Sequence, residues 1–383
     1  MQIATSLQQI QPSYLREILA AASSEGVISF AGGLPDASSF PMSLMQQSLH
    51  NMADKPVLFQ YAGTQGYPPL LSYCAAHYQL KSEHLSLICN GSQQGLDLIA
   101  RAFINPGDCV VMEAPSYLGA LQVFGLAQAN ILSVNSNQQG PDLNELEQCF
   151  RDNQVKIFYA VPDFHNPTGV CWSLATRLKV AQLCCEYNVT LLEDVPYREL
   201  HFSGESLPLV SSFCVEHSIV LRSFSKFIAP GMRLGVVSAK ANWINALIKV
   251  KQAADLHTNI PMQALLLDIL QHPGFATHLV NLRKSYAQRY AKMAALISEK
   301  LDNFCQFEPV TGGMFIWLSI KDCNVMALAE RALTLGVSIV PSDVFYTDAK
   351  QQPSALRLNF SHTPLGQIAT GIDRLSQSIK DGD

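Results

Sequence analysis

Short apolar runs alternate with longer amphipathic segments through the middle of the chain, and this alternation limits the fold more than any other sequence feature. Each apolar run has the length of a buried strand, and each amphipathic segment has helical periodicity. Strands separated by helices form mainly parallel sheets with helices on both faces, so the pattern predicts an α/β fold. The predicted strands are residues 85–90, 109–114, 155–161, 188–194, 218–223 and 233–239, with helices at 91–104, 117–127 and 175–188.

The pattern changes near residue 266. A long periodic stretch predicts a helix, and strands alternating with helices follow it. A chain of 383 residues is also long for a single core, which favours two domains. We predict a large domain at residues 40–265 and a smaller α+β domain formed by residues 1–39 and 266–383. The long helix is predicted at 275–302, and the later strands at 312–320, 336–341 and 355–360.

Composition and charge exclude several classes of protein. Hydrophobic residues make up 48% of the chain and charged residues 15%, which is typical of a folded globule. The net charge of −5 gives no strong attraction for nucleic acid or anionic lipid, so we expect neither as a partner. We also expect no membrane span and no signal peptide. The ten cysteines lack zinc-type spacing, so we expect no metal, and reduced thiols in a cytoplasmic protein.

Polar residues follow several predicted strands at the point where each strand ends. Gly91, Ser92 and Gln93 follow the strand at 85–90 and open a helix. Free backbone N–H groups at the start of a helix favour a phosphate. An ordinary helix cap explains this turn equally well.

The next strand ends bring an amide, an acid and a phenol. Asn166 begins an Asn-Pro-Thr-Gly turn, Asp194 ends a strand, and Tyr197 follows three residues later. Taken singly, these are ordinary turn and capping residues. Because ligands bind outside the carboxyl ends of the strands in such folds, we expect these side chains to lie together.

A lysine stands among hydroxyl groups after the fifth predicted strand. Ser223 and Ser225 lie beside Lys226, and Arg233 follows seven residues after the lysine. A solvated surface loop is the ordinary explanation for such a lysine. Gly231 is expected to let this loop turn back toward the strands.

Together these groups match the chemical requirements of pyridoxal phosphate. A lysine amine forms a Schiff base with the cofactor aldehyde, and a carboxylate keeps the pyridine nitrogen protonated. Other donors hold the ring oxygen, and an aromatic face stacks on the ring. Several donors and an arginine hold the dianionic phosphate. The sequence contains each of these groups, so we predict pyridoxal phosphate as the cofactor.

The ordered set of motifs resembles the class I/II aminotransferases of fold type I. It is most similar to the subgroup that contains 2-aminoadipate and kynurenine aminotransferases and the aminotransferase-like domains of MocR-type regulators. The resemblance implies a large domain with a mainly parallel, mixed seven-stranded sheet covered by helices, and a smaller α+β domain. The motifs are AGGLPD, QYAGTQGYPPL, NGSQQGLDL, EAPSY, HNPTG, EDVPY, SFSK with PGMRLG, GGMFIWL and LRLNFS, and they span nearly the whole chain.

The resemblance implies a role for each matching residue at the cofactor ring. Lys226 bonds covalently to the cofactor, and Asp194 faces the pyridine nitrogen. Asn166 and Tyr197 hold the ring oxygen, and Tyr117 of EAPSY stacks on the ring. Lys226, Asp194 and Tyr197 are therefore the predicted catalytic residues.

The resemblance also implies contacts for the phosphate and the substrate. Tyr61 should reach the phosphate of the partner subunit, because enzymes of this family are homodimers with shared active sites. Arg357 should clamp the substrate α-carboxylate, Gly33 should let the backbone approach the substrate, and Asn166 should contact it. The predicted phosphate-binding residues of the same chain are Ser92, Gln93, Ser223, Ser225 and Arg233.

Three positions bear on which substrate is chosen. His165 stands where relatives often have Gln, and it either lies near the ring or has a capping or packing role. Ser342 stands where relatives commonly have Gly, so the loop near the substrate is expected to be reshaped. Arg16 either pairs with an acidic substrate side chain or is an ordinary solvated arginine.

The implied activity is transfer of an amino group from an α-amino acid to a 2-keto acid, commonly 2-oxoglutarate, by a ping-pong mechanism through Lys226. A lyase or synthase of the same fold uses the same lysine, aspartate and tyrosine, so it remains an alternative. A regulatory, non-catalytic binding module is a second alternative. The net charge of −5 and motifs that begin near residue 13 argue against DNA binding.

Overall fold

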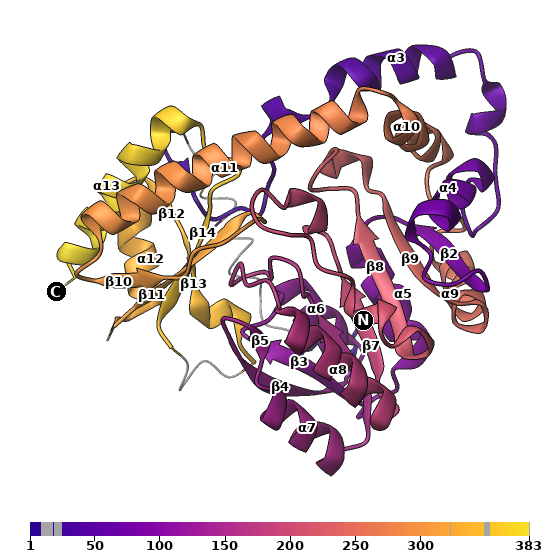
Figure 1. Cartoon of the computed structure of the whole chain (residues 1–383), viewed down its shortest axis with the longest axis horizontal. Coiled ribbons are helices and arrows are strands. Elements are labelled where there is room, and N and C mark those ends of the chain that lie inside the picture. Colours follow the sequence, from indigo (N-terminus) through magenta and orange to yellow (C-terminus); the bar gives the residue numbers. More distant parts are fainter. Residues whose placement is uncertain (9–17, 19–24, 322, 348–352, 383) are drawn as a thin grey trace.

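A twisted sheet of eight strands organises the larger part of the molecule (Figure 1). The computed structural model describes residues 1–8, 18, 25–321, 323–347 and 353–382, and all numbers of strands and helices refer to these residues. The strand order is β2-β9-β8-β7-β6-β3-β4-β5. The strands are β2 His84–Cys89, β3 Cys109–Ala114, β4 Asn130–Asn137, β5 Gly140–Pro141, β6 Val155–Ala160, β7 Thr190–Asp194, β8 Ser218–Ser223 and β9 Gly235–Lys240.

The sheet is mixed and mainly parallel, which confirms the predicted α/β fold. Strands β8, β7, β6, β3 and β4 pair in parallel. Strand β9 runs antiparallel to both of its neighbours, β8 and β2, so β2 points the same way as the parallel strands. The carboxyl ends of β2, β3, β6, β7 and β8 therefore meet at one edge of the sheet.

The sheet has one strand more than the seven expected. The chain turns back after β4, and the short strand β5 pairs antiparallel with the end of β4. Strand β4 itself was not among the strands predicted from apolar runs. Most residues of β4 are partly or fully exposed, and buried and exposed positions do not alternate regularly, because the strand lies near the edge of the sheet. It therefore lacks the continuous apolar run by which a buried strand is recognised.

Helices cover both faces of this sheet, and the period of two along each strand separates two apolar cores. In β3, Val110 and Met112 belong to the core that contains α5, whereas Cys109 and Val111 belong to the core that contains α7 and α8. Burial on both faces explains why these strands are apolar throughout. The helices of this part are α3 Met42–Met52, α4 Pro68–Tyr78, α5 Ser92–Phe103, α6 Leu118–Leu126, α7 Leu143–Asp152, α8 Leu174–Glu186, α9 Ala241–Ala254 and α10 Ile260–Gln271.

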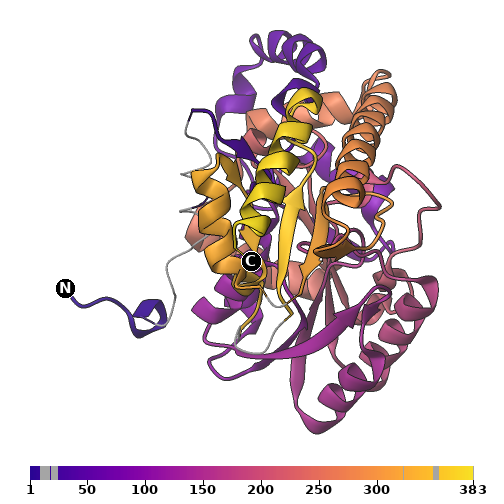
Figure 2. The ribbon, with the colours of Figure 1, turned by 90° about the vertical axis from the view of Figure 1, so that its left-hand side faces the viewer.

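A smaller antiparallel sheet, of order β10-β11-β14-β13, lies at the other end of the molecule (Figure 1). The long helix α11 runs from the α10 end to this sheet and packs against α13, and Figure 2 shows α12 and α13 side by side. The elements are α11 Phe275–Lys300, β10 Cys305–Phe307, β11 Phe315–Ile320, α12 Val325–Thr334, β13 Val340–Pro341, β14 Ala355–Asn359 and α13 Leu365–Lys380.

The N-terminal segment joins the C-terminal part of the chain. Strand β1, Ile28–Ser29, pairs in parallel with β12, Val337–Ser338, and the N–H of Phe30 donates to the carbonyl of Ser338. This pairing joins residues 28–30 to the C-terminal part of the chain, and the assignment of residues 1–39 and 266–383 to one domain stays a prediction. Helix α1, Thr5–Gln8, precedes this segment. In the part of the chain that the structure describes, no helix is long and apolar enough to cross a membrane.

Gly235 lets two backbones approach each other at the edge of the sheet. A Cβ atom at this position would lie 2.8 Å from the carbonyl carbon of Gly91 and 2.9 Å from the backbone nitrogen of Ser92. Both contacts are with backbone, which cannot move aside as the end of a side chain can. We expect Gly235→Ala to lower the free energy of unfolding by about 1–3 kcal/mol.

Urea unfolding of the purified variant measures this change. Gly366→Ala is the matched control, because a Cβ atom there meets nothing within 4 Å. Equal stability of the two variants would show that the backbones around Gly235 are not held in contact.

Candidate active site

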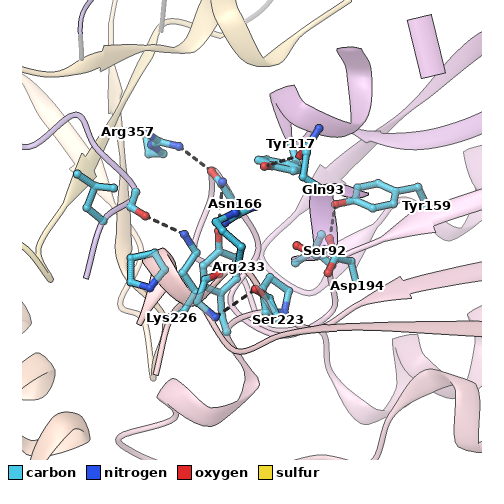
Figure 3. A pocket seen from close by; sticks show the side chains of 17 residues that line it. Ser92, Gln93, Tyr117, Tyr159, Asn166, Asp194, Ser223, Lys226, Arg233 and Arg357 are labelled. Atoms are coloured by element: carbon cyan, nitrogen blue, oxygen red, sulfur yellow. Dashed lines mark hydrogen bonds between the residues drawn. The ribbon is translucent and has the colours of Figure 1, made fainter. Parts of the chain in front are cut away.

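A cavity of about 300 Å³ opens at the edge where the strand ends meet. Most of its lining comes from the segments that follow β2, β3, β6, β7 and β8, and the remainder from the ends of β6, β7 and β8, from the N-terminal segment and from β14 (Figure 3). The lining residues are Gly33, Leu34, Ser92, Gln93, Tyr117, Tyr159, Val161, Asn166, Asp194, Pro196, Tyr197, Ser223, Ser225, Lys226, Pro230, Arg233 and Arg357.

Lys226 places its amine in the cavity close to the N-terminal segment. Its Nζ atom donates a hydrogen bond of 2.9 Å to the carbonyl oxygen of Gly33. Burial, together with the positive charges of Arg357 and Arg233, lowers the pKa of the Lys226 amine to about 8. Burial disfavours the charged form of an amine, so a neutral, nucleophilic form is accessible near neutral pH.

Asp194 ends strand β7 with a buried carboxylate. Its Oδ2 atom accepts a hydrogen bond of 3.0 Å from the Tyr159 hydroxyl. Among the described residues its Oδ1 atom has no hydrogen-bond partner. Burial raises the pKa of the Asp194 carboxyl to about 7, against the lowering effects of the Tyr159 hydrogen bond and of the charge on Lys226. A buried carboxylate oxygen without a partner can accept a proton or a hydrogen bond from a ligand.

Asn166, Tyr197 and Arg357 all line the cavity and are joined by hydrogen bonds, and Figure 3 shows the bond between Arg357 and Asn166. The Asn166 side-chain amide donates to the Tyr197 hydroxyl at 3.3 Å, and Arg357 Nη1 donates to Asn166 Oδ1 at 2.8 Å. Arg357 Nη2 donates to the carbonyl of Ala31 at 2.5 Å, while its Nε atom has no partner among the described residues. Burial lowers the pKa of the Arg357 guanidinium to about 10, so it remains a cation at neutral pH.

Aromatic rings enclose the Arg357 guanidinium. The centroids of the Phe315 and Phe345 rings lie 4.5 Å and 5.1 Å from its central carbon. Such cation–π contacts are strongest where water is excluded. They hold the guanidinium in place while leaving one of its donor atoms available to a ligand.

The opposite end of the cavity gathers donors around the start of helix α5. Gly91 has φ of +79°, and a Cβ atom there would lie 2.8 Å from Arg233 Nη2. Arg233 Nη2 donates to the carbonyl of Asn90 at 3.2 Å, and the Ser225 N–H donates to the Ser223 hydroxyl at 3.3 Å. Backbone N–H groups at a helix start, next to an arginine and hydroxyls, form a typical anion-binding arrangement.

In the turn that precedes β9, the residue that allows the backbone to turn is not the expected one. The left-handed residue is Arg233, with φ of 51°, and not Gly231, which has ordinary dihedral angles and open space around it. The expectation for Gly231 was wrong, because the preceding Pro230 starts a short 3-10 helix that needs no glycine. The left-handed conformation of Arg233 brings its side chain back over the start of α5.

A hydrogen bond joins the side chains of Gln93 and Tyr117, which both line the cavity. The Tyr117 hydroxyl donates to Gln93 Oε1 at 3.1 Å, and Gln93 Nε2 donates to the carbonyl of Gly119 at 3.1 Å. The Gln93 side chain is therefore engaged with the segment that carries Tyr117, and its backbone N–H remains for an anion.

Tyr61, which is predicted to reach the phosphate of the partner subunit, does not line the cavity of its own chain, so that contact stays a prediction. Its side chain is 80% exposed, and its ring contacts that of His257, with the centroids 6.0 Å apart. Arg16 lies outside the described residues, so its role stays a prediction. The other predicted site residues all line the cavity.

The two departures from the family pattern are both accommodated. His165 is buried and does not line the cavity; its Nδ1 atom lies 3.0 Å from the Thr168 hydroxyl, which corresponds to the packing alternative. Burial lowers the pKa of the His165 imidazole to about 3, so it is neutral. Ser342 does not have positive φ, and its hydroxyl accepts from the N–H of Ala355 at 3.2 Å. The loop therefore needs no glycine at this position.

Sequence reasoning missed Tyr159, although this residue holds Asp194. Its strand was predicted as a buried apolar run, so the phenol was interpreted as a core side chain and not as a site residue. The signal was the period of two: Tyr159 lies in β6, Val161 directly follows the strand two residues later, and both line the cavity. No group of three or more metal-ligating side chains occurs among the described residues.

Known proteins match this chain over most of its length. The sequence profile described as aminotransferase class I and II matches residues 26–375. A 2-aminoadipate transaminase of Thermus thermophilus is 34% identical over 379 residues, which cover 97% of this chain and 95% of the relative. An aromatic-amino-acid aminotransferase of Thermococcus litoralis is 31% identical, with 97% of this chain and 92% of the relative covered.

A solved structure matches the fold equally well. It is an alpha-aminoadipate aminotransferase from Thermus thermophilus, complexed with N-(5'-phosphopyridoxyl)-L-leucine, with a TM-score of 0.92 and 33% identity over 99% of this chain and 97% of that chain. The profile match, the similarity to these relatives and the shared architecture show that this chain belongs to the class I and II aminotransferases.

Proposed function

We propose that the protein is a transaminase that moves the amino group of an α-amino acid to a 2-keto acid, with pyridoxal phosphate as its cofactor. Membership of the aminotransferase family supports this activity and this cofactor. The observation that carries the proposal is the placement of Lys226, Asp194 and Arg357 on one cavity. An amine, a buried acid and a buried guanidinium are the groups that this reaction needs.

The residues present fit the cofactor. The unpartnered Oδ1 atom of Asp194 is suited to a protonated ring nitrogen, and the amide and phenol of Asn166 and Tyr197 are suited to the ring oxygen. The aromatic face of Tyr117 can stack on the ring, and Lys226 can bond to its aldehyde. The phosphate would be held by the start of α5, Ser223, Ser225 and Arg233.

Bound pyridoxal phosphate supplies an electron-accepting ring that stabilises negative charge at the substrate α-carbon. Asp194 keeps that ring nitrogen protonated, because a buried carboxylate strongly favours a positive charge beside it. As a neutral amine, Lys226 Nζ would take the proton from the substrate α-carbon and later return a proton to the substrate. Its lowered pKa favours the neutral amine that this transfer requires.

Arg357 orients the substrate in our proposal. Its guanidinium is buried and held by Asn166, Ala31 and two aromatic rings, so it is already in place before a ligand arrives. Pairing with an α-carboxylate fixes the substrate so that its α-carbon faces Lys226. Gly33, whose carbonyl accepts from Lys226, allows the N-terminal segment to lie against the substrate.

The amino-acid side chain and the acceptor are further parts of the proposal. We infer that 2-oxoglutarate is the acceptor and that the two half-reactions alternate, as in ping-pong kinetics. The similarity to a 2-aminoadipate transaminase supports an acidic donor, whereas the similarity to an aromatic-amino-acid aminotransferase supports broad specificity. Arg16 is the cation that we propose for an acidic side chain.

Product analysis with a series of donors separates this function from its rivals. Release of ammonia or of a cleaved side chain, with no need for a keto acid, would favour a lyase. Tight binding of amino acids without any conversion would favour a regulatory module.

We further propose a homodimer in which Tyr61 contacts the phosphate of the partner subunit. Val57, Phe59 and Tyr61 are 77%, 67% and 80% exposed within one short segment. Exposed large apolar side chains that gather in this way are typical of an interface. We also propose the cytoplasm as the compartment, because the buried cysteines Cys74 and Cys89 are reduced thiols, which persist in a reducing environment.

The mass in solution tests the dimer. We expect light scattering to give about twice the 42.0 kDa of a single chain. Tyr61→Phe should keep this mass and weaken cofactor binding, because it keeps the aromatic ring and removes only the hydroxyl proposed to contact the phosphate. A single-chain mass in the active enzyme would contradict shared active sites.

A panel of single amino acids tests the activity. With a preferred donor, we expect the yellow band of the purified holoenzyme to give way to the absorption of the pyridoxamine form, and the fastest donor identifies the substrate class. Lys226→Ala should lose turnover entirely, because it lacks the amine that moves the proton. Full activity in this variant would contradict the proposed role of Lys226.

The pH dependence of cofactor capture tests the lowered pKa of Lys226. The protonated amine cannot attack an aldehyde, so capture by the apo-protein should accelerate about tenfold per pH unit below the pKa of about 8 and level off above it. Stopped-flow absorbance measures the rate, with Lys226→Ala as the blank. A rate that still rises steeply above about pH 9 would mean that the amine keeps the ordinary pKa of an exposed lysine.

A further inference from the structure

An ion pair between a fully buried lysine and a partly buried aspartate lies directly behind the turn that starts helix α5. Lys251, in the last turn of α9, has no exposed side-chain surface, and its Nζ atom lies 2.8 Å from both carboxylate oxygens of Asp255. Lysine is almost never fully buried unless it is paired. A pair of this kind costs desolvation energy, which is offset only where further hydrogen bonds satisfy both charges.

The further hydrogen bonds all come from the two residues that bracket the turn. Asp255 Oδ2 accepts from Gln94 Nε2 at 2.6 Å and from Asn90 Nδ2 at 2.7 Å. Lys251 Nζ donates to Gln94 Oε1 at 3.1 Å, and that same oxygen accepts from the backbone N–H of Asn90 at 2.8 Å. Asn90 and Gln94 are thus fixed to each other and to the ion pair.

Between Asn90 and Gln94 lie Gly91, Ser92 and Gln93, whose backbone forms the anion-binding start of α5. The carbonyl of Asn90 also accepts from Arg233 Nη2. The ion pair therefore forms hydrogen bonds on both sides of the turn. Through Asn90 it is also linked to Arg233. Lys251, Asp255, Asn90 and Gln94 do not line the cavity, so none of them competes for a ligand there.

We propose that Lys251 and Asp255 are positioning residues for the phosphate of the cofactor, which they serve by holding the turn from Asn90 to Gln94 in its phosphate-binding conformation. This inference rests on the proposed function. Donors that are already oriented lose little entropy when the phosphate binds, so their affinity is high. The groups suited to the pyridine ring, Asp194 and Lys226, stand on other loops and do not depend on this ion pair.

Different groups would hold the phosphate and the pyridine ring of the cofactor. Loss of the ion pair should therefore weaken phosphate binding selectively, and this can be tested. We would replace Lys251 by Met in the full-length protein, prepare the apo-form, and measure dissociation constants for pyridoxal phosphate, for pyridoxal without phosphate and for inorganic phosphate. We expect the affinity for pyridoxal phosphate and for phosphate to fall about tenfold or more, the loss typical of hydrogen bonds to a charged group. The affinity for pyridoxal should change by less than about twofold.

Lys249→Met is the matched control, because Lys249 lies on the exposed face of the same helix. It should leave all three dissociation constants unchanged. Asp255→Asn should reproduce the selective loss. If Lys251→Met does not fold, Gln94→Met keeps the ion pair, removes its hydrogen bonds to the Gln94 side of the turn and should show a selective loss in the same direction.

Two results would overturn the inference. The first is an equal loss of affinity for pyridoxal phosphate and for pyridoxal, which would show a general structural role. The second is unchanged affinity for pyridoxal phosphate in a folded variant. Failure of the proposed function looks different, because the wild-type protein itself would then bind pyridoxal phosphate no better than pyridoxal.

Discussion

The hydrogen bond between Arg357 and Asn166 joins the two sheets of the molecule, and the cavity depends on it. Arg357 belongs to strand β14 of the small sheet, and Asn166 follows β6 of the large one. The same guanidinium also binds the carbonyl of Ala31 in the N-terminal segment. Three regions far apart in the chain therefore meet at one buried cation. Loss of any partner would leave part of this charge without compensation in a region that water cannot reach.

Burial acts on the acid and on the base of the site in opposite directions. It raises the pKa of Asp194 to about 7 and lowers that of Lys226 to about 8, so both neutral forms become accessible near neutral pH. Neither group would have this property at the surface. The same removal of water strengthens every contact that a charged ligand makes inside the cavity. The fold thus sets the chemistry of these side chains as much as their identity does.

The strand ends, the parallel sheet and most of the cavity could be predicted because they follow from local signals. Apolar runs identify buried strands, and the polar residue after each run lies at the ligand edge of the sheet. Strand β4 was missed because it is largely polar, and Tyr159 was missed because it lies inside an apolar run. The left-handed conformation of Arg233 depends on tertiary contacts. The link from Lys251 to Gln94 joins residues 157 positions apart, which no local pattern reports.

The pairing of β1 with β12 has a consequence for the order in which the site is completed during synthesis. The cavity residues suited to the cofactor lie between Ser92 and Arg233, whereas Gly33 and Arg357 come from segments more than three hundred positions apart. The ribosome must therefore release the chain beyond residue 357 before the guanidinium that is proposed to face a substrate can reach the cavity. Contacts between such distant segments form late in folding because they close the longest loops. Recognition of the cofactor can thus precede recognition of the substrate in the life of each molecule.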